Sequence, residues 1–449
     1  MAGAGEGRRE GSLEAPTRHP LAWREPGFYD ASALEAELER VFDICHGCRR
    51  CFSLCQSFPT LFDLIDATSD GELGGVDKRM YAQVVDNCYL CDMCYMTKCP
   101  YVPPHEWNVD FPHLMLRAKA VKSKAGGASA RDRLLAATDT VGRIAGIPVV
   151  AQVVNAVNGT RTGRVVLEKV LGVHRDAPIP EYHSRTARDL LKVLPRPAGP
   201  PQATPGTTGR VAIFSTCYGN RNEPDLVTDL AAVFAHNGIE LSLVAREACC
   251  GMPKLELGDL DAVARLKEQN LPQLLALVEA GYDIVAPIPS CVLMFKQELP
   301  LMFPEDAGVQ KVRARIFDPF EYLMLRHKAG QLRTDFAATL GTVSYHVACH
   351  LRVQNIGLKT RDVLRLVPGT TVEAIERCSG HDGTYAVKKE FRAASMKIAK
   401  PVVQKVQAAA ADHYSSDCPM AGHQLESGLP AGSRPPEHPL KLLRQAYGI

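Results

Sequence analysis

The stretches 45-CHGCRRCFSLC-55 and 88-CYLCDMCYMTKCP-100 hold eight of the 15 cysteines and decide how the N-terminal part of the chain folds. Their cysteines follow the spacings C-x2-C-x2-C-x3-C and C-x2-C-x2-C-x4-C-P. Three thiolates at steps of three residues curl around one corner of a cubane and bind three different irons of a 4Fe–4S cluster. The two runs therefore predict two 4Fe–4S clusters, each completed by a more distant cysteine.

The distant cysteine of each run decides which thiolates share a cluster. In two-cluster ferredoxins, the fourth cysteine of one run binds the cluster of the other run. The same exchange in this chain predicts two ligand sets: Cys45, Cys48, Cys51 and Cys99 for the first cluster, and Cys88, Cys91, Cys94 and Cys55 for the second.

Zinc and disulfides are the alternatives for these eight cysteines. Structural zinc takes four tetrahedral ligands, commonly as two separated C-x2-C pairs, and two triads with satellites fit that pattern poorly. A disulfide framework needs an oxidising compartment, and the first 20 residues lack the apolar core of a signal peptide. Iron–sulfur clusters are therefore the interpretation that we favour.

The composition bounds the class of protein. The chain has 449 residues, which is enough for two to four domains, with 46% hydrophobic and 23% charged residues. A formal net charge of +2 gives no electrostatic footprint for nucleic acid. No stretch reaches the roughly 18 uncharged apolar residues of a membrane helix. We expect a cytoplasmic protein without a transmembrane helix, with peripheral contact at the cytoplasmic membrane face left open.

The chain before the linker is expected to be helical. Residues 31–44 place Leu34, Leu38, Val41 and Phe42 on one face of a helix. We predict a mobile tail over residues 1–30, a helical ferredoxin-like domain over 31–124 and a helical connector over 125–209. The connector ends in a stretch rich in Pro, Gly and Thr. Its apolar helices either pack on neighbouring domains, which we favour, or lie on a membrane or a partner.

The chain after the linker repeats itself. Strands expected at 210–217 and 342–349 each end in a cysteine, and later cysteines recur in the same order about 130 residues apart. The pairs are Cys217 with Cys349, Cys249 with Cys378, and Cys291 with Cys418. Alternation of strands and helices predicts parallel open sheets. Ligands bind beyond the carboxyl ends of such strands, where these cysteines fall.

These residues resemble a known family. The order Cys217, Cys249-Cys250-Gly251 and Cys291 is similar to the CCG domain of proteins related to heterodisulfide reductase, and the second half has Cys349, Cys378-Ser379-Gly380 and Cys418. The whole plan resembles the iron–sulfur proteins of anaerobic glycerol-3-phosphate dehydrogenase (its C subunit), glycolate oxidase and heterodisulfide reductase (its D subunit). The resemblance implies a multidomain α plus α/β chain, with a helical ferredoxin domain followed by CCG domains over 210–340 and 341–449.

The chain departs from the five-cysteine CCG pattern in both halves. Met294 stands at the last cysteine position of the first half, and Ser379 and Ala421 replace two cysteines in the second. The first half retains four thiolates for an iron–sulfur cluster or a zinc ion: Cys217, Cys249, Cys250 and Cys291. The second retains three, Cys349, Cys378 and Cys418, and needs a further ligand, for which His350 and His381 are candidates, with Asp382 as an orienting group. The alternative is that the second half is a structural copy without a metal.

Electron transfer is the leading function implied by the resemblance. No G-x-G-x-x-G follows an expected strand, so we expect electrons to come from a partner, a flavin dehydrogenase, and to pass to a quinone or a thiol/disulfide acceptor. The alternative is a stand-alone reductase of a disulfide or small oxidant at a CCG metal site, linked to oxidative stress. Its candidate catalytic residues are His346, His350, His381 and Asp382. A sensor or scaffold is a third option, for which the sequence offers no distinct feature.

Overall fold

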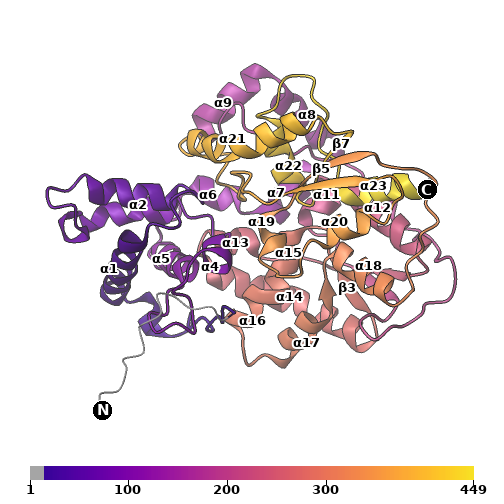
Figure 1. The fold of residues 1–449 in the computed structure, drawn as a ribbon, viewed down its shortest axis with the longest axis horizontal. Helices are drawn as coiled ribbons and strands as arrows, with labels where there is room; N and C mark the ends of the chain where they lie inside the picture. Colours follow the sequence, from indigo (N-terminus) through magenta and orange to yellow (C-terminus); the bar gives the residue numbers. More distant parts are fainter. Residues whose placement is uncertain (1–14) are drawn as a thin grey trace, which may run out of the picture. The chain divides into compact units, whose positions relative to one another are not determined.

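The computed structural model describes residues 15–449, which divide after Val121 into two compact units (Figure 1). The first unit is helical in its described part. Its helices are α1 (Ala31–Cys48), α2 (Ser57–Asp66), α3 (Tyr81–Asp86), α4 (Met93–Thr97) and α5 (Phe111–Lys124), joined by the 3-10 turns η1 (Pro26–Tyr29), η2 (Leu73–Gly75) and η3 (Lys78–Met80).

Helix α1 forms where the apolar periodicity predicts it and delivers the chain to the first cysteine run. Asp30 caps its start, because the carboxylate accepts the Ala33 N–H at 2.6 Å. The helix ends at Cys48, where the left-handed backbone of Arg49 (φ 51°) turns the chain away. The apolar face is buried through Leu34, Leu38, Val41 and Phe42.

Aromatic rings close the core of the first unit. The ring of Phe111 lies 4.6 Å from that of Phe58 and 6.2 Å from that of Phe42. Phe42 also meets Tyr81 edge to face at 5.1 Å. These contacts tie α1, α2, α3 and α5 together, so the two cysteine runs between these helices are carried on a packed frame.

The expected tail covers residues 1–30, of which 1–14 lie outside the described residues. Its described part makes specific contacts with the second cysteine run and with the loop that follows it. The Thr17 N–H donates to the Pro103 carbonyl at 3.0 Å. The Thr17 carbonyl accepts the Tyr95 hydroxyl at 2.6 Å.

The second unit begins with the connector and continues into two parallel sheets. The connector helices are α6 (Ala130–Leu135), α7 (Thr138–Ala145), α8 (Pro148–Gly159), α9 (Arg161–Leu171) and α10 (Ala187–Leu190). The stretch 196–209 has no helix or strand and lies within this unit. It is held in place where the Ala198 N–H donates to the Ala235 carbonyl and Arg326 donates to the Gln202 carbonyl at 2.8 Å.

The first sheet has the strand order β2-β1-β3-β4, with all strands parallel. Its strands are β1 (Arg210–Ile213), β2 (Glu240–Leu243), β3 (Asp283–Val285) and β4 (Ile316–Phe317). Between and after them run α11 (Cys217–Arg221), α12 (Pro224–His236), α13 (Met252–Glu256), α14 (Leu260–Glu279), α15 (Pro289–Leu293), the π-turn η4 (Met294–Glu298), α16 (Leu299–Met302), α17 (Ala307–Arg315) and α18 (Pro319–Lys328).

The second sheet repeats this plan in the order β6-β5-β7, again parallel. Its strands are β5 (Thr342–His346), β6 (Thr371–Ile375) and β7 (His413–Ser416), with helices α19 (Cys349–Arg352), α20 (Lys359–Leu364), α21 (Arg392–Ala409), α22 (Pro419–Glu426) and α23 (Pro439–Tyr447). The expected α/β architecture with parallel sheets is confirmed.

The strands are shorter than the sequence suggests. The apolar pattern predicts strands that run to Cys217 and Cys349, but β1 ends at Ile213 and β5 at His346. Each cysteine instead begins the helix that follows its strand. The cysteines are therefore set in the turns beyond the carboxyl ends of the strands, which is where open parallel sheets present their ligands.

Candidate functional site

In the first unit, the thiols of the first expected ligand set lie beside one another. The pKa of the Cys45 thiol is raised well above its usual value by burial and then by the nearby charges of Cys51, Cys99 and Cys48. Burial also raises the pKa of Cys51 to about 12, with Cys99 and Cys48 adding to it. Cys99 belongs to the other run, so its place beside Cys48 is not a consequence of sequence spacing.

The second set is assembled in the same way. The pKa of Cys55 is raised by burial and by Cys88 and Cys91, and opposed by the backbone N–H groups of Ser57 and Phe58. These amides lie at the start of α2, where unpaired N–H groups favour a thiolate. The pKa of Cys94 is likewise raised by burial and then by its neighbours, which are Cys51, Cys88, Cys91 and Cys55.

The cysteines of the two runs lie near one another without converging on one point. None of the 15 cysteines, which all lie within residues 15–449, forms a disulfide. Within residues 15–449, no three His, Cys, Asp or Glu side chains converge as ligands of one metal ion. Ligands of a 4Fe–4S cluster bind different irons and need not converge on one point.

Arg18 fixes the turn inside the second cysteine run. Its guanidinium pairs with Asp92, which lies between Cys91 and Met93, and with Asp110 at 2.9 Å. Asp92 has a left-handed backbone (φ 59°), a conformation that is uncommon outside glycine and in which aspartate is enriched. Burial raises the pKa of the Asp110 carboxyl, but His113 and Arg18 outweigh it, so the pKa is lowered to about 2.

In the second unit, the four cysteines of the first CCG half form a chain of sulfur contacts. Neighbouring thiols shift one another's pKa, which places Cys217 beside Cys249, Cys249 beside Cys250, and Cys250 beside Cys291. The pKa of Cys249 is lowered well below its usual value, chiefly because Cys217 and Cys250 donate to it; burial opposes this, and the Gly251 N–H assists. The four thiols are therefore gathered in one buried site.

The turn that presents Cys217 is strained. Thr216, which is fully buried, has φ 66° and ψ 159°, a conformation that is nearly restricted to glycine. Its hydroxyl accepts the Gly219 N–H at 3.0 Å and caps α11. Such strain costs on the order of 1–3 kcal/mol and persists only where the surroundings enforce it.

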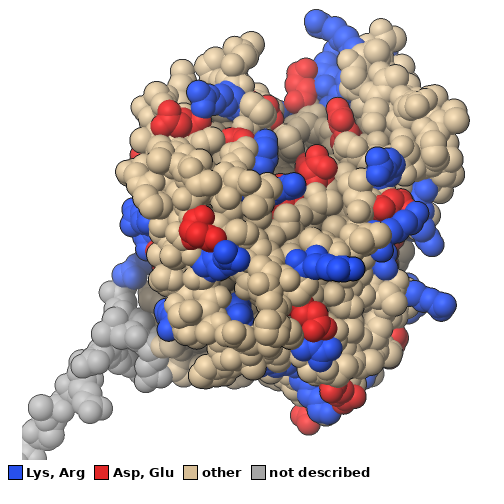
Figure 2. Space-filling view, turned by 90° about the vertical axis from the view of Figure 1, so that its right-hand side faces the viewer, with Lys and Arg blue, Asp and Glu red and all other residues tan. Residues whose placement is uncertain are grey.

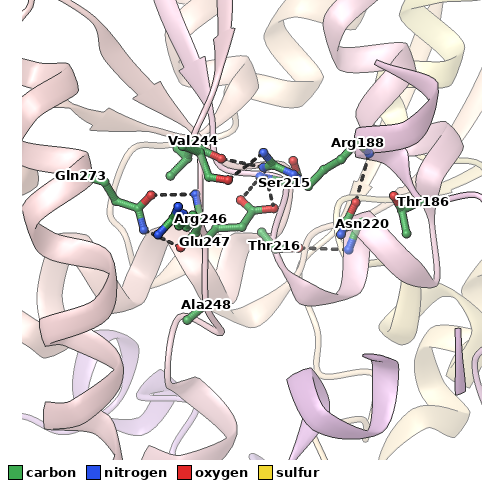
Figure 3. Close-up of polar contacts among 12 residues, drawn as sticks. Thr186, Arg188, Ser215, Thr216, Asn220, Val244, Arg246, Glu247, Ala248 and Gln273 are labelled. Carbon is green, nitrogen blue, oxygen red and sulfur yellow. Dashed lines mark hydrogen bonds and ion pairs between the residues drawn. The ribbon is translucent and has the colours of Figure 1, made fainter. Parts of the chain in front are cut away.

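Glu247 is the group that holds this turn from the opposite side (Figure 3). Its carboxylate accepts the Ser215 N–H at 2.7 Å, and Arg188 lies 3.7 Å from its other oxygen. Burial raises the pKa of Glu247 to about 7, against the effect of Arg188 and the amides of Ser215 and Thr216. Arg188 in turn donates to the Val244 carbonyl at 2.6 Å, so β2 and the Cys217 turn are joined.

The glycine and the methionine of the first CCG half are neighbours. Gly251 has φ 101°, so a residue with a side chain would be strained there. A Cβ at this position would also lie 3.6 Å from Cε of Met294, which is fully buried. Met294, at the position of the missing fifth cysteine, therefore packs beside the CCG turn.

The cysteines of the second CCG half lie in the turns that follow its strands. Cys349 begins α19, Cys418 precedes α22, and Cys378 accepts the Gly380 N–H at 3.3 Å. Burial raises the pKa of Cys418 to about 11; Asp417 and then Cys291 add to it, and the amides of Ala421 and Met420 oppose it. Cys418 therefore lies near a cysteine of the first half.

The candidate histidines have different surroundings. Both ring nitrogens of His346 are engaged, at 3.0 Å from Ser416 Oγ and 3.0 Å from the Arg377 carbonyl oxygen, which is the setting of a core histidine. Both ring nitrogens of His381 are buried without a hydrogen-bond partner among the described residues. Burial, then His350 and Arg392, lowers the pKa of His381 to about 4, so its ring is neutral.

His350 joins the two halves. Its Nδ1 lies 2.7 Å from Ser290 Oγ, one residue before Cys291. Gln354 donates to the Pro289 carbonyl at 3.2 Å beside it. Asp382 contributes a backbone contact, because its carbonyl accepts the Tyr385 N–H at 2.6 Å. Its expected orienting role stays a prediction.

Three residues of this site were not expected from the sequence. Thr138 and Asp139 of α7 contact the first CCG cysteines, and Glu247 holds the Cys217 turn. A charged residue two positions before the buried Cys249-Cys250 pair was the available signal for Glu247. The roles of Thr138 and Asp139 depend on contacts across about 80 to 110 residues of sequence, which local patterns do not reveal.

The surface adds two observations. On the face drawn in Figure 2, Lys and Arg alternate with Asp and Glu among the described residues, and neither sign dominates. No one helix within residues 15–449 has the length and apolar character to cross a membrane; α7 and α8 meet those criteria only as a pair, and the chain bends by 105° between them.

Comparisons with known proteins agree with this arrangement. The model of the CCG cysteine-rich domain matches residues 211–296 and 343–426. The chain is 28% identical over 342 residues to the C subunit of anaerobic glycerol-3-phosphate dehydrogenase of Escherichia coli strain K12, covering 76% of this chain and 82% of the relative. It is 23% identical to the B subunit of fumarate reductase (CoM/CoB) of Methanothermobacter marburgensis, covering 85% of this chain and 68% of the relative.

A shorter relative aligns with part of the chain. Lactate utilization protein A of Bacillus cereus strain B4264 is 26% identical over 220 residues, which is 46% of this chain and 87% of the relative. The matched relatives thus include named subunits of a dehydrogenase and of a reductase. The chain carries two CCG cysteine-rich domains and is homologous to these proteins.

Proposed function

We propose that this protein is the iron–sulfur electron-transfer subunit of an oxidoreductase. The observation that carries the proposal is the proximity of thiols from both runs: Cys45 lies near Cys99 of the other run, and Cys55 lies near Cys88 and Cys91. A set of four thiolates from C-x2-C-x2-C runs is the usual ligand complement of a 4Fe–4S cluster, which transfers one electron at a time when bound.

The residues of the first unit fit two such clusters. The eight proposed ligands are Cys45, Cys48, Cys51 and Cys99 in one set and Cys88, Cys91, Cys94 and Cys55 in the other, within a helical ferredoxin-type domain. Burial raises the pKa of the free thiols, so the thiolates need a compensating positive charge. Iron supplies that charge, whereas an apo site of this kind would be costly to ionise.

The first CCG half is proposed to hold a further iron–sulfur cluster or zinc through Cys217, Cys249, Cys250 and Cys291. Four thiolates complete a metal's coordination, so this centre would be closed. The second half, with Cys349, Cys378 and Cys418, would leave a position for a histidine or an exogenous ligand. His381 suits that position because both its ring nitrogens are buried without a partner among the described residues and its ring is neutral.

The electron donor is proposed to be a flavin dehydrogenase that assembles with this chain. The relatives named as subunits of a dehydrogenase and a reductase support a multi-subunit assembly. The acceptor is proposed to be a quinone or a thiol/disulfide compound. A second candidate function, direct reduction of a disulfide or small oxidant at the second CCG half, is favoured by the buried unpartnered ring of His381.

We also propose peripheral contact with the cytoplasmic membrane face through the connector. Helix α8 exposes Val149, Val153 and Val157 at intervals of four residues, and Val149 is 70% exposed. Between residues 140 and 167 every charged side chain is an arginine. An apolar helix face flanked by arginines suits a bilayer with anionic headgroups.

Rapid mixing tests the proposed function. The reconstituted full chain is reduced with dithionite, freed of excess reductant and mixed with decyl-ubiquinone or with glutathione disulfide. Reoxidation of the clusters by one of the two, with no turnover of glycerol 3-phosphate or lactate by the chain alone, is the expected result. Sustained turnover of glycerol 3-phosphate or lactate with a dye acceptor and no partner would contradict a subunit role.

A further inference from the structure

Helix α7 of the connector contacts two sulfurs of the first CCG half. The Thr138 hydroxyl lies 3.4 Å from Cys217 Sγ and 3.5 Å from Cys249 Sγ. The next residue, Asp139, accepts the Cys249 N–H at 2.6 Å. Thr138 and Asp139 lie outside both stretches that match the CCG domain, so nothing in that domain's pattern assigns them a role.

Helix α7 is held in position by packing against α11. Cys217 is the first residue of α11, and Arg221 is the last. A Cβ on Gly142 of α7 would lie 2.8 Å from Cδ of Arg221, so a larger residue there would displace the Arg221 side chain that packs against this helix. Arg221 and Arg143 also offset the negative charge of Asp139. The Thr138 hydroxyl is therefore held against the sulfurs by packing.

Hydrogen bonds to ligand sulfurs change the properties of a metal centre. A donor to a thiolate stabilises negative charge on sulfur, and the reduced form of a cluster carries more of that charge than the oxidised form. When Cys217 and Cys249 are both thiolates, neither has a proton to give, and the Thr138 hydroxyl can donate to one of them. Removing this donor favours the oxidised form and lowers the midpoint potential.

We propose that Thr138 is a positioning residue of the first CCG centre, which orients and tunes the thiolates of Cys217 and Cys249 through its hydroxyl. Asp139 has a supporting role, since it fixes the backbone of the Cys249 turn. The connector is thus part of the electron-transfer site. This inference rests on the proposed metal centre at Cys217, Cys249, Cys250 and Cys291.

The test compares three variants of the reconstituted full chain. Thr138→Val removes the hydroxyl and keeps the shape of the side chain. Thr138→Ser keeps the hydroxyl. Thr140→Val makes the same chemical change two residues later on the same helix, where the side chain is exposed.

The first readout is the midpoint potential of the first CCG centre, measured in an EPR-monitored redox titration. We expect Thr138→Val to lower the ratio of reduced to oxidised centre about tenfold at a fixed potential. This change equals a fall of about 59 mV in the midpoint potential of a one-electron couple. Thr138→Ser and Thr140→Val should match the wild type. An unshifted potential in Thr138→Val with full metal content would overturn the proposal.

The second readout applies where the centre is redox-silent or Thr138→Val lowers its occupancy. It is the rate at which a chelator removes the metal, which should rise several-fold in Thr138→Val and stay unchanged in the other two variants. Equal rates in all proteins would overturn the inference alone. A wild-type chain with no metal on these four cysteines would overturn the proposed centre, and this inference with it.

Discussion

Ser290 Oγ and His350 Nδ1 lie 2.7 Å apart and join the two CCG domains where their cysteines lie. Ser290 precedes Cys291 in the first domain, and His350 follows Cys349 in the second. The proximity of Cys418 to Cys291 belongs to the same contact. The two domains therefore present their cysteine-bearing turns to each other. The hydrogen bond that links them can be tested by mutation.

Replacing Ser290 with alanine should weaken the junction between the domains. His350 is buried and would lose this hydrogen bond, at a cost of about 1–2 kcal/mol. We expect a lower midpoint of guanidinium unfolding, followed by fluorescence. Ser184→Ala, at an exposed serine in the same unit, is the control. A Ser290→Ala midpoint equal to that of the control would show that the contact does not stabilise the junction.

Serine variants of the cysteine runs test the cluster assignment. Cys55→Ser should give the same EPR spectrum after reduction as Cys88→Ser, because both are proposed ligands of one cluster. Cys99→Ser should match Cys45→Ser instead. If Cys55→Ser matched Cys45→Ser, each run would hold its own cluster and the proposed exchange of ligands would be wrong.

His423 should make the stability of the second unit depend on pH. Its Nε2 lies 3.5 Å from Glu223 and its Nδ1 2.9 Å from Glu426. The hydrogen bond to Glu223 is the largest effect and raises the pKa to about 9, against burial and with help from Glu426. Folding therefore favours the charged ring, and its stabilisation is fully present below pH 6.5 and lost as the pH rises to about 9.

The corresponding experiment compares unfolding midpoints of the wild type and His423→Gln at several pH values. The difference should be largest at pH 6 and vanish near pH 9.5. Glu223→Gln should reduce the wild-type dependence in the same direction. A difference that grows with pH would contradict the assignment of a charged histidine.

The exposed valines of α8 test the proposed membrane contact. Val149→Ser combined with Val153→Ser removes apolar area from the exposed face, so binding to vesicles with anionic lipids should fall several-fold in co-sedimentation. Val193→Ser is the matched control, since Val193 is 87% exposed but lies outside these helices. Unchanged vesicle binding by the double variant, or no vesicle binding by the wild type, would show that this surface is not a membrane contact.

The sequence predicted those parts of the fold that depend on local patterns. The periodicity of Leu34, Leu38, Val41 and Phe42 gave α1, and the recurrence of cysteines gave two α/β copies. It missed β2 and β6, because four or five half-buried residues carry no long apolar run. It also extended β1 to Cys217, since nothing local marks the strained turn at Thr216.

The site was predictable only in its cysteines. Their spacing is a property of the sequence, whereas Thr138 reaches Cys249 across 111 residues. His346 is a comparable case, because its place near the cysteine-bearing end of an expected strand suggested a reactive group, while the structure engages both its ring nitrogens in the core. Contacts of this kind depend on how distant elements pack against each other, which no single stretch of sequence predicts.

The central claim is that the first unit holds two 4Fe–4S clusters, and its most direct test is anaerobic iron and sulfide analysis with EPR during stepwise reduction. We analyse a wild-type chain beside one in which Cys217, Cys249, Cys250 and Cys291 are all serine. The account predicts about eight irons and eight sulfides in that variant, with two interacting S = 1/2 signals after full reduction. Zinc in place of iron, or about four irons and a single signal, would contradict it.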